Sequence, residues 1–194
     1  AVLIAVAATF GPPFVRQAFA ALPPLFVSIP VFFVGIVLVQ IFSFRLGLIP
    51  AIGADPAQAL VLPVATLAIP LSAPLAQVLI RSIDEVRARP FVDVVRARGA
   101  SDTWLLWRNI ARNAVLPALT MAGLIFGELV GGAVVTESVF GRAGVGQLTA
   151  QAVAARDAPV LLAVVVLSAL AFVVINLIVD LSYPALDPRL RGAR

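Results

Sequence analysis

The amino-acid sequence predicts an all-α integral membrane protein, a polytopic helical bundle, from three observations. The chain has 194 residues, of which 61% are hydrophobic and only 12% are charged, whereas soluble domains carry about 25% charged residues. Its mean hydropathy is +1.07. Four apolar segments, at about 22–44, 59–80, 116–136 and 159–183, are bounded by polar residues, glycine or proline, and each is long enough to cross a bilayer as a helix. We therefore expect lipid to surround most of the chain.

The residues before the first span are expected to form the end of a truncated spanning helix and then a cytoplasmic loop, over 1–21. The first ten, AVLIAVAATF, are apolar but far fewer than the ~20 that a transmembrane helix needs. They also lack the basic region and the polar cleavage stretch of a signal peptide. Residues 22–194 are then expected to form the transmembrane domain.

The distribution of arginine predicts the orientation of the spans. The stretches 10–21, 81–115 and 185–194 hold eleven arginines, whereas 45–58 and 137–158 hold three. With four spans these two sets alternate sides of the membrane, and cytoplasmic loops carry the excess of basic residues. We therefore expect the arginine-rich set in the cytoplasm and the other two loops outside.

The long cytoplasmic segment 82–115 is predicted to contain three helical pieces. Pro90 and Gly99 separate a continuation of the second span, a short helix of about 91–98, and a third piece that Ser101 can N-cap. In the third piece, apolar residues recur at helical spacing on one side and arginines lie four apart on the other: Leu105, Leu106, Ile110 and Ala114, against Arg108 and Arg112. Such an amphipathic element fits either anionic lipid headgroups or a partner protein. Trp104 and Trp107 are interpreted as interfacial anchors or as the apolar face of this segment.

Residue types that are missing exclude several kinds of site. The chain contains no cysteine and no histidine, and all 14 basic residues are arginine. Disulfides, thiol nucleophiles, Cys/His metal sites, histidine bases and lysine-containing phosphate loops are therefore excluded. We predict no catalytic residue, no metal site and no cofactor, so that any ATP hydrolysis belongs to another chain. The net charge of +4 is interpreted as a topology signal, and no nucleic-acid partner is expected.

Two features lie within the third span. Gly123, Gly127 and Gly131 are spaced four apart, as in ridges of small residues that let another helix approach closely. Glu128 lies beside them in mid-span, where an ionisable group is costly without water or a partner. Glu128 is predicted either to face a translocation path, or to remain protonated or bond to a neighbouring helix.

The sequence resembles the permease subunits of binding-protein-dependent ABC importers, in the dipeptide, oligopeptide and nickel branch. The run FVDVVRARG over 91–99, followed by Leu116-Pro117, is similar to the cytoplasmic signature loop of that family. Asp93 replaces the family's glutamate, and two valines replace its alanines. The run ESVFGRAGVG over 137–146 resembles the family's outer loop, and the run LDPR over 186–189 resembles its carboxyl end.

This resemblance implies the fold of a type I ABC importer permease with a cytoplasmic coupling helix, in the bacterial cytoplasmic (inner) membrane. It implies ATP-binding subunits, a second homologous permease subunit and an extracytoplasmic solute-binding protein as partners. The chain would then form half of the path for short peptides or a related solute, by alternating access. The residues implied are Asp93, Arg96, Ala97, Arg98, Gly99 and Ser101 for ATPase coupling, Gly123, Gly127, Glu128 and Gly131 for the path or helix packing, and Glu137, Phe140, Gly144 and Gly146 for the outer loop.

Other functions remain open from the sequence alone. A secondary transporter or channel usually carries several intramembrane ionisable groups, whereas this chain offers Glu128 and the marginal Asp180. An intramembrane enzyme without histidine or cysteine would need two converging carboxylates, and these two lie at different depths. An importer of the same branch could also move nickel or another small solute.

Overall fold

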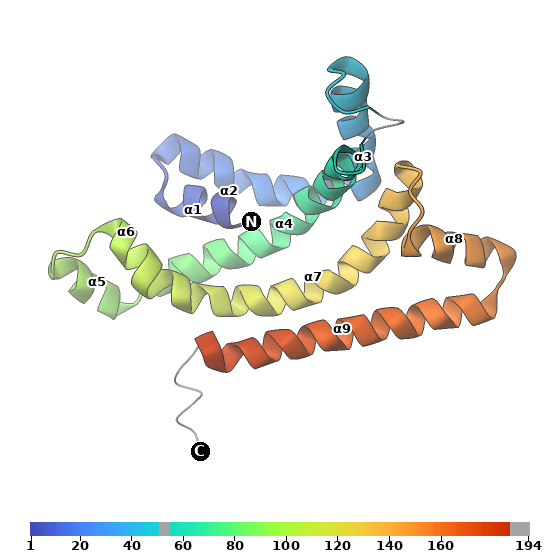
Figure 1. Ribbon diagram of the computed structural model, residues 1–194. Coiled ribbons are helices and arrows are strands. Elements are labelled where there is room, and N and C mark those ends of the chain that lie inside the picture. The colour runs from blue at the N-terminus through green and yellow to red at the C-terminus, as the bar shows by residue number, and fades with distance from the viewer. Residues whose placement is uncertain (51–54, 187–194) are drawn as a thin grey trace. The chain divides into compact units, whose positions relative to one another are not determined.

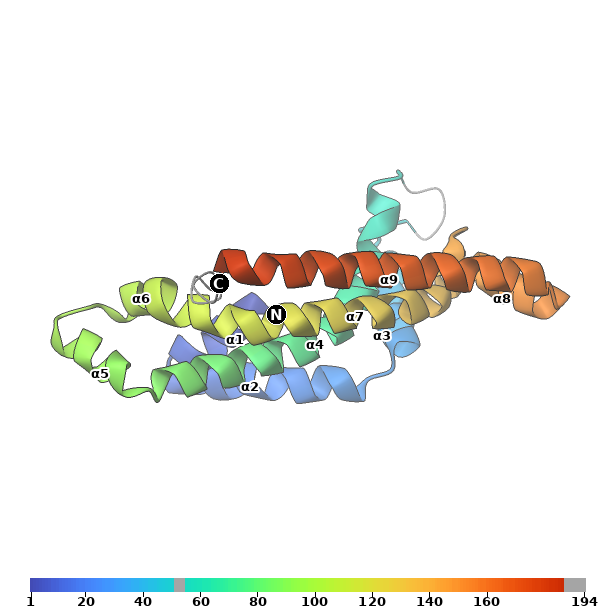
Figure 2. The ribbon, with the colours of Figure 1, turned by 90° about the horizontal axis from the view of Figure 1, so that it is seen from below.

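The computed structural model describes residues 1–50 and 55–186, and the regular structure within them is entirely helical (Figures 1 and 2). The helices, in order, are α1 (Val2–Phe10), α2 (Pro13–Ser28), α3 (Val31–Leu38), the π-helical turn η1 (Val39–Arg45), α4 (Gln58–Arg87), α5 (Pro90–Ala97), α6 (Asp102–Leu105), the π-helical turn η2 (Leu106–Ile110), α7 (Ala111–Val139), α8 (Val145–Ala155) and α9 (Ala158–Leu186). Of the expected carboxyl-terminal motif over 186–189, residues 187–189 lie outside the described residues.

Three of the described helical segments are long and apolar enough to cross a membrane. They are Gln58–Arg87, Leu106–Val139 and Ala158–Pro184. The expected spans 59–80, 116–136 and 159–183 lie inside them. The first two segments extend beyond the expected spans, because polar and charged residues continue each helix past its apolar stretch, whereas the third adds only Ala158 and Pro184.

The first expected span, 22–44, is not the single helix that its composition predicts. α2 ends at Ser28, and the segment Val31–Arg45 leaves the break at an angle of 107°. The reason is Pro30, which precedes α3 with extended backbone (φ −60°, ψ 140°). Proline disfavours helical backbone at the residue before it and provides no N–H for the preceding turn. Helices α2 and α3 together are apolar enough for one broken span.

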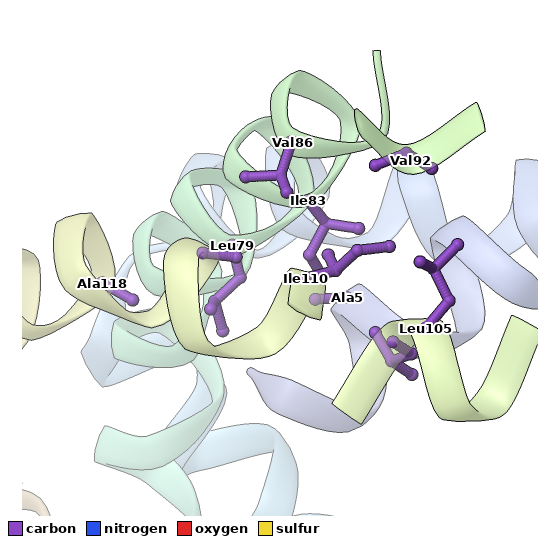
Figure 3. Close-up of a cluster of buried hydrophobic side chains, with 10 residues drawn as sticks. Ala5, Leu79, Ile83, Val86, Val92, Leu105, Ile110 and Ala118 are labelled. Atoms are coloured by element: carbon purple, nitrogen blue, oxygen red, sulfur yellow. The ribbon is translucent and has the colours of Figure 1, made fainter. Parts of the chain in front are cut away.

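The helices form two compact units, each with its own packing. The first comprises residues 1–24, 73–124 and the described part of 174–194. Its core joins α4 to five other elements, α1, α5, α6, η2 and α7. Leu79 and Ile83 of α4 pack near Ala5 of α1, Val92 of α5 and Ile110 of η2 (Figure 3). Val92 is 1% exposed and Ile110 is 0% exposed. The short elements α5, α6 and η2 are therefore packed against α4, which precedes them in the chain.

The second unit comprises residues 25–72 and 125–173, of which 51–54 are not described. Small residues allow close helix contacts in it. A Cβ atom on Gly35 of α3 would lie 3.2 Å from Thr66 of α4, and one on Gly132 of α7 would lie 2.9 Å from Leu67. A larger residue at either glycine would force these helices apart or displace the facing side chain.

Candidate functional site: the segment after α4 and the loop after α7

Helix α5 begins and ends with residues suited to those positions. Pro90 occupies its first turn, where a missing N–H costs nothing. Asp93 lies in the first turn and Arg96 in the last, the arrangement that the helix dipole favours. Val92 points into the core of the first unit, whereas Asp93, Arg96 and Ala97 are exposed. The helix is thus fixed on one face and presents three of the predicted coupling residues on its surface.

Gly99 ends this helical piece, as the sequence predicts, and its backbone is left-handed. Its φ is +86°, and its N–H donates to the carbonyl of Arg96 at 2.9 Å. Side chains with a Cβ atom rarely adopt this conformation. Apart from the residues next to Gly99 in the chain, no described heavy atom lies within 4 Å of the place where that Cβ atom would be. Backbone geometry therefore favours glycine here, without crowding from the described residues.

Ser101 caps the next helix, as predicted. Its Oγ accepts a hydrogen bond from the backbone N–H of Trp104 at 3.3 Å. The apolar stripe that follows is buried, and it comprises Leu105, Leu106, Ile110 and Ala114. Arg108 and Arg112 are exposed, which confirms the amphipathic pattern expected for this piece.

Arg87, which the sequence did not single out, fixes the end of α4 to the end of α1. Its Nη1 donates to the carbonyl of Thr9 at 3.1 Å, and its guanidinium carbon lies 4.9 Å from the centre of the Phe10 ring. The last carbonyls of a helix lack partners within the helix, so Arg87 satisfies one of them while it stacks on an aromatic ring. Nothing in the local sequence signals this contact, because the partners are 78 residues apart.

The segment after α4 carries a wide, open depression of about 510 Å³ on its surface. The depression is lined by Val95, Arg98, Gly99, Ala100, Ser101 and Trp104. It brings together Arg98, Gly99 and Ser101 among the predicted coupling residues. Asp93, Arg96 and Ala97 lie on the exposed face of α5 and do not line it. The segment therefore offers a basic and partly apolar surface that a complementary partner could cover.

The glycines of α7 differ in what they face. In the first unit, a Cβ atom on Gly123 would lie 2.8 Å from the side-chain oxygen of Asn176 in α9. In the second unit, one on Gly127 would lie 3.5 Å from Phe172, whereas one on Gly131 would have no atom of the described residues within 4 Å. The first two positions thus allow close packing against α9.

Glu128 is exposed, and among the described residues it has no ion-pair partner.

In the outer loop, Glu137 supplies the missing cap of helix α8. Gly144 occupies the N-cap position without a side chain to offer. Instead, Oε2 of Glu137 accepts the N–H of Gln147, the third residue of α8, at 2.8 Å. A carboxylate at a helix amino terminus is favoured both by this hydrogen bond and by the dipole.

The predicted glycines of the outer loop are required by close contacts. A Cβ atom on Gly144 would overlap the carboxylate of Glu137, and one on Gly146 would overlap the backbone of Val134. Phe140 packs near Gly35 of α3, where a Cβ atom would lie 3.5 Å from its ring. These residues lock α8 against the end of α7 within the second unit.

Arg142 completes the outer loop. Its backbone N–H donates to the carbonyl of Glu137 at 2.9 Å, and its Nη1 donates to the carbonyl of Ala59 at 3.1 Å. That carbonyl lies four residues before Pro63, which has no N–H to donate to it.

Among the described residues, no group of three or more His, Cys, Asp or Glu side chains could hold a metal ion.

The described residues thus form a helical protein of the membrane-spanning type, with three helices long and apolar enough to cross a bilayer. Residues 1–192 match the model of one protein family, the binding-protein-dependent transport system inner membrane component. The chain belongs to this family, which consists of transport permeases and not of catalytic subunits.

Named relatives agree with this assignment. The chain is 41% identical over 165 residues to the glutathione transport system permease protein GsiC of Escherichia coli strain K12, and equally to that of Shigella dysenteriae. The GsiC of Salmonella choleraesuis is also 41% identical. Each alignment covers 85% of this chain and 54% of the relative, so the chain spans about half the length of these curated relatives.

A solved structure shows the same fold. A chain of the MetNI methionine ABC transporter, in inward-facing conformations, superimposes with a TM-score of 0.73 at 20% sequence identity. The match covers 96% of this chain and 83% of that one. The predicted fold of a type I ABC importer permease is thereby confirmed.

Proposed function

We propose that this chain is the membrane-spanning part of an ATP-driven importer, in which it forms half of the path for short peptides or a related small solute. Membership of the family supports the transport role. The name of the GsiC relatives refers to glutathione, a tripeptide, and supports the solute class. Uptake proceeds by alternating access, driven by a separate ATPase because the chain has no lysine for a phosphate loop.

The observation that carries this proposal is the rigid attachment of the segment after α4. Val92 of α5 and Leu105 of α6 are each 1% exposed and belong to one core with Ile83 of α4 and Ala5 of α1. A force applied to the exposed face of α5 is therefore passed directly to α4 and α1. An element that is anchored on one face and exposed on the other suits the transfer of motion from an ATPase.

The partners and the topology follow from the same proposal. ATP-binding subunits bind the exposed face of α5 and the turn at Gly99. A second homologous permease subunit completes the path, and an extracytoplasmic binding protein delivers the solute to the outer side. In this proposal the segments at about 22–44, 59–80, 116–136 and 159–183 are the four spans, the first of them broken at Pro30, in the bacterial inner membrane. The segment 82–115 then lies in the cytoplasm and the loop over 137–158 outside. Glu128, exposed on α7, faces the path in this arrangement.

A combined variant tests the coupling role. The full-length protein, purified with its associated subunits and reconstituted in vesicles, is compared with a Gly99→Leu, Arg96→Glu, Arg98→Glu variant. Leucine cannot readily adopt the φ of +86° at position 99, and the reversed charges lose hydrogen bonds worth about 1–3 kcal/mol each. We expect insertion into the membrane to persist while solute-stimulated ATP hydrolysis and uptake fall at least tenfold.

The control is Arg16→Glu, which changes an exposed arginine of α2 and leaves the segment intact. Full stimulated hydrolysis and uptake in the triple variant would eliminate this segment as the coupling element. Absence of any co-purifying ATPase from the tagged wild-type chain would refute the importer itself, so the two failures are distinguishable.

A further inference from the structure

The surface of the first unit has two adjoining hollows that share Trp107. One is a pocket of about 190 Å³ lined only by apolar side chains of α1, α4, η2 and α7, including Val6, Ile83 and Ala111. The other is an open depression of about 510 Å³ lined by Ser101, Trp104, Trp107 and Arg108. Because Trp107 lines both, a molecule with an apolar part and a polar part can occupy the two together.

The apolar pocket has the properties of a hydrocarbon site. It offers no polar side chain to hold water, and apolar cavities of about 150 Å³ stay dry and bind hydrocarbons. Its lining residues Leu79 and Val115 lie at the cytoplasmic ends of the second and third expected spans, next to the inner leaflet. A lipid acyl chain is the apolar molecule present at that depth.

The open depression has the properties of a phosphate site. Arg108 is exposed, and among the side chains that the structure describes it forms no ion pair. The hydroxyl of Ser101 accepts a hydrogen bond from Trp104, so its own hydrogen is still available to donate. Trp104 is 49% and Trp107 65% exposed, and tryptophan is enriched at the level of lipid headgroups.

We propose that these two hollows bind one anionic phospholipid of the inner leaflet, with an acyl chain in the apolar pocket and the phosphate beside Arg108. The charge is complementary, since guanidinium groups form charge-assisted hydrogen bonds with phosphate. Each arginine near a membrane surface favours anionic lipid by about 1 kcal/mol, which corresponds to a selectivity of about fivefold over zwitterionic lipid. The proposal rests on the expected topology and adds a lipid partner to the proposed importer.

Photo-crosslinking at the shared residue tests the proposal. The variant Trp107→p-benzoylphenylalanine of the full-length protein, purified with its associated subunits, is placed in vesicles that mix phosphatidylglycerol and phosphatidylcholine in equal parts. After irradiation, mass spectrometry identifies what is attached to position 107. We expect phosphatidylglycerol adducts to exceed phosphatidylcholine adducts about fivefold.

Two further substitutions separate the polar from the apolar part of the site. Arg108→Gln in the same background should reduce the ratio to about one, whereas Arg16→Gln, which removes an equal charge from an exposed residue of α2, should preserve it. Ala111→Phe, which fills the apolar pocket, should lower the adducts of both lipids. Gel filtration checks that each variant is folded, and Val6→Phe replaces Ala111→Phe if that variant is not.

Three results would overturn the proposal. Equal capture of the two lipids by the protein with Arg108 intact would exclude the phosphate site. Undiminished capture in the folded pocket-filling variant would exclude the acyl-chain site. Attachment of position 107 to another protein chain would mean that a partner subunit covers this surface, and the absence of any lipid adduct would mean that no lipid occupies it.

Discussion

At the scale of single residues, a proline within a helix determines the role of an arginine far along the chain. Pro63 leaves the carbonyl of Ala59 without its helical donor, and Arg142 donates to that carbonyl. In lipid no water replaces such a partner, so the unsatisfied group must be bonded within the protein. Arg142 is therefore better explained as a structural donor than as a topology signal alone.

A double-mutant cycle tests this pairing. Arg142→Leu should lower the free energy of unfolding by about 1 kcal/mol, because a partly buried acceptor loses its donor. In a Pro63→Ala background the restored backbone N–H can bond to Ala59, so the same substitution should cost much less. Thermal unfolding of the purified protein measures both effects, and equal losses in the two backgrounds would contradict the assignment.

Glu128 gives the second prediction at this scale. If it lines the path, Glu128→Gln keeps a polar group there and should reduce uptake moderately, whereas Glu128→Leu should reduce it severely, because an apolar side chain removes a hydration site from the path. Assembly should be unchanged in both, since the residue is exposed in this chain. Uptake into vesicles is the measurement, and normal transport by Glu128→Leu would show that the carboxylate has no part in the pathway.

At the scale of elements, helix α8 depends on groups outside itself. Its N-cap is a glycine, and its first turn is bonded to a side chain of the preceding helix, through Glu137. The two glycines of the loop let the chain turn closely enough for this bond to form. The outer loop is therefore a preformed structure and not a flexible link.

Three substitutions in the outer loop and α7 should separate these contributions. Glu137→Ala should lower stability by about 1 kcal/mol through loss of the cap, and Glu137→Gln, which retains an acceptor oxygen, should lower it less. Gly146→Ala should be the most damaging, because its Cβ atom would overlap the backbone of Val134. The matched control is Gly131→Ala, where the space is open. Melting temperatures rank the variants, and a tolerated Gly146→Ala would contradict the close packing.

At the scale of the whole molecule, the proposed topology is open to a direct test, because the chain has no native cysteine. Ala100→Cys lies in the segment assigned to the cytoplasm, and Ala155→Cys lies in the exposed outer region. In intact cells a membrane-impermeant maleimide should label position 155 and should label position 100 only after the membrane is opened. Labelling of position 100 from outside would overturn both the topology and the coupling role.

Local patterns predicted much of this architecture, and long-range contacts did not follow from them. Ser101 and Gly99 could be assigned because caps and left-handed turns depend on neighbouring residues. The break before α3 could not be assigned in this way. Pro23 and Pro24 lie inside α2 without ending it, whereas the helix breaks and changes direction at Pro30. The sequence does not tell which proline finds other partners for the carbonyls that it leaves free.

The contacts that fix the functional segment were equally hidden. The bond from Arg87 to Thr9 joins residues 78 positions apart, and nothing near either one signals it. The carboxylate of Glu137 matched the family pattern, but its role as a cap depends on how the chain returns through Gly144. Family resemblance could thus identify such residues before their physical role was visible.

The π-helical turn η2 sets the rotational phase between the coupling segment and α7. The N–H of Ala111 bonds to the carbonyl of Leu106, five residues earlier, so this turn contains one more residue than an α-helical turn. Each α-helical residue advances about 100° around the axis. If the turn relaxed to an α-helix with all its residues, α5 and α6 would rotate by about a quarter of a turn, and Leu105 would leave the core. Deletion of one residue within 106–110 would remove the extra residue of the π-helical turn. An ordinary α-helical turn would then keep the rotational phase between α6 and α7, so the number of residues in this turn matters more than their identity.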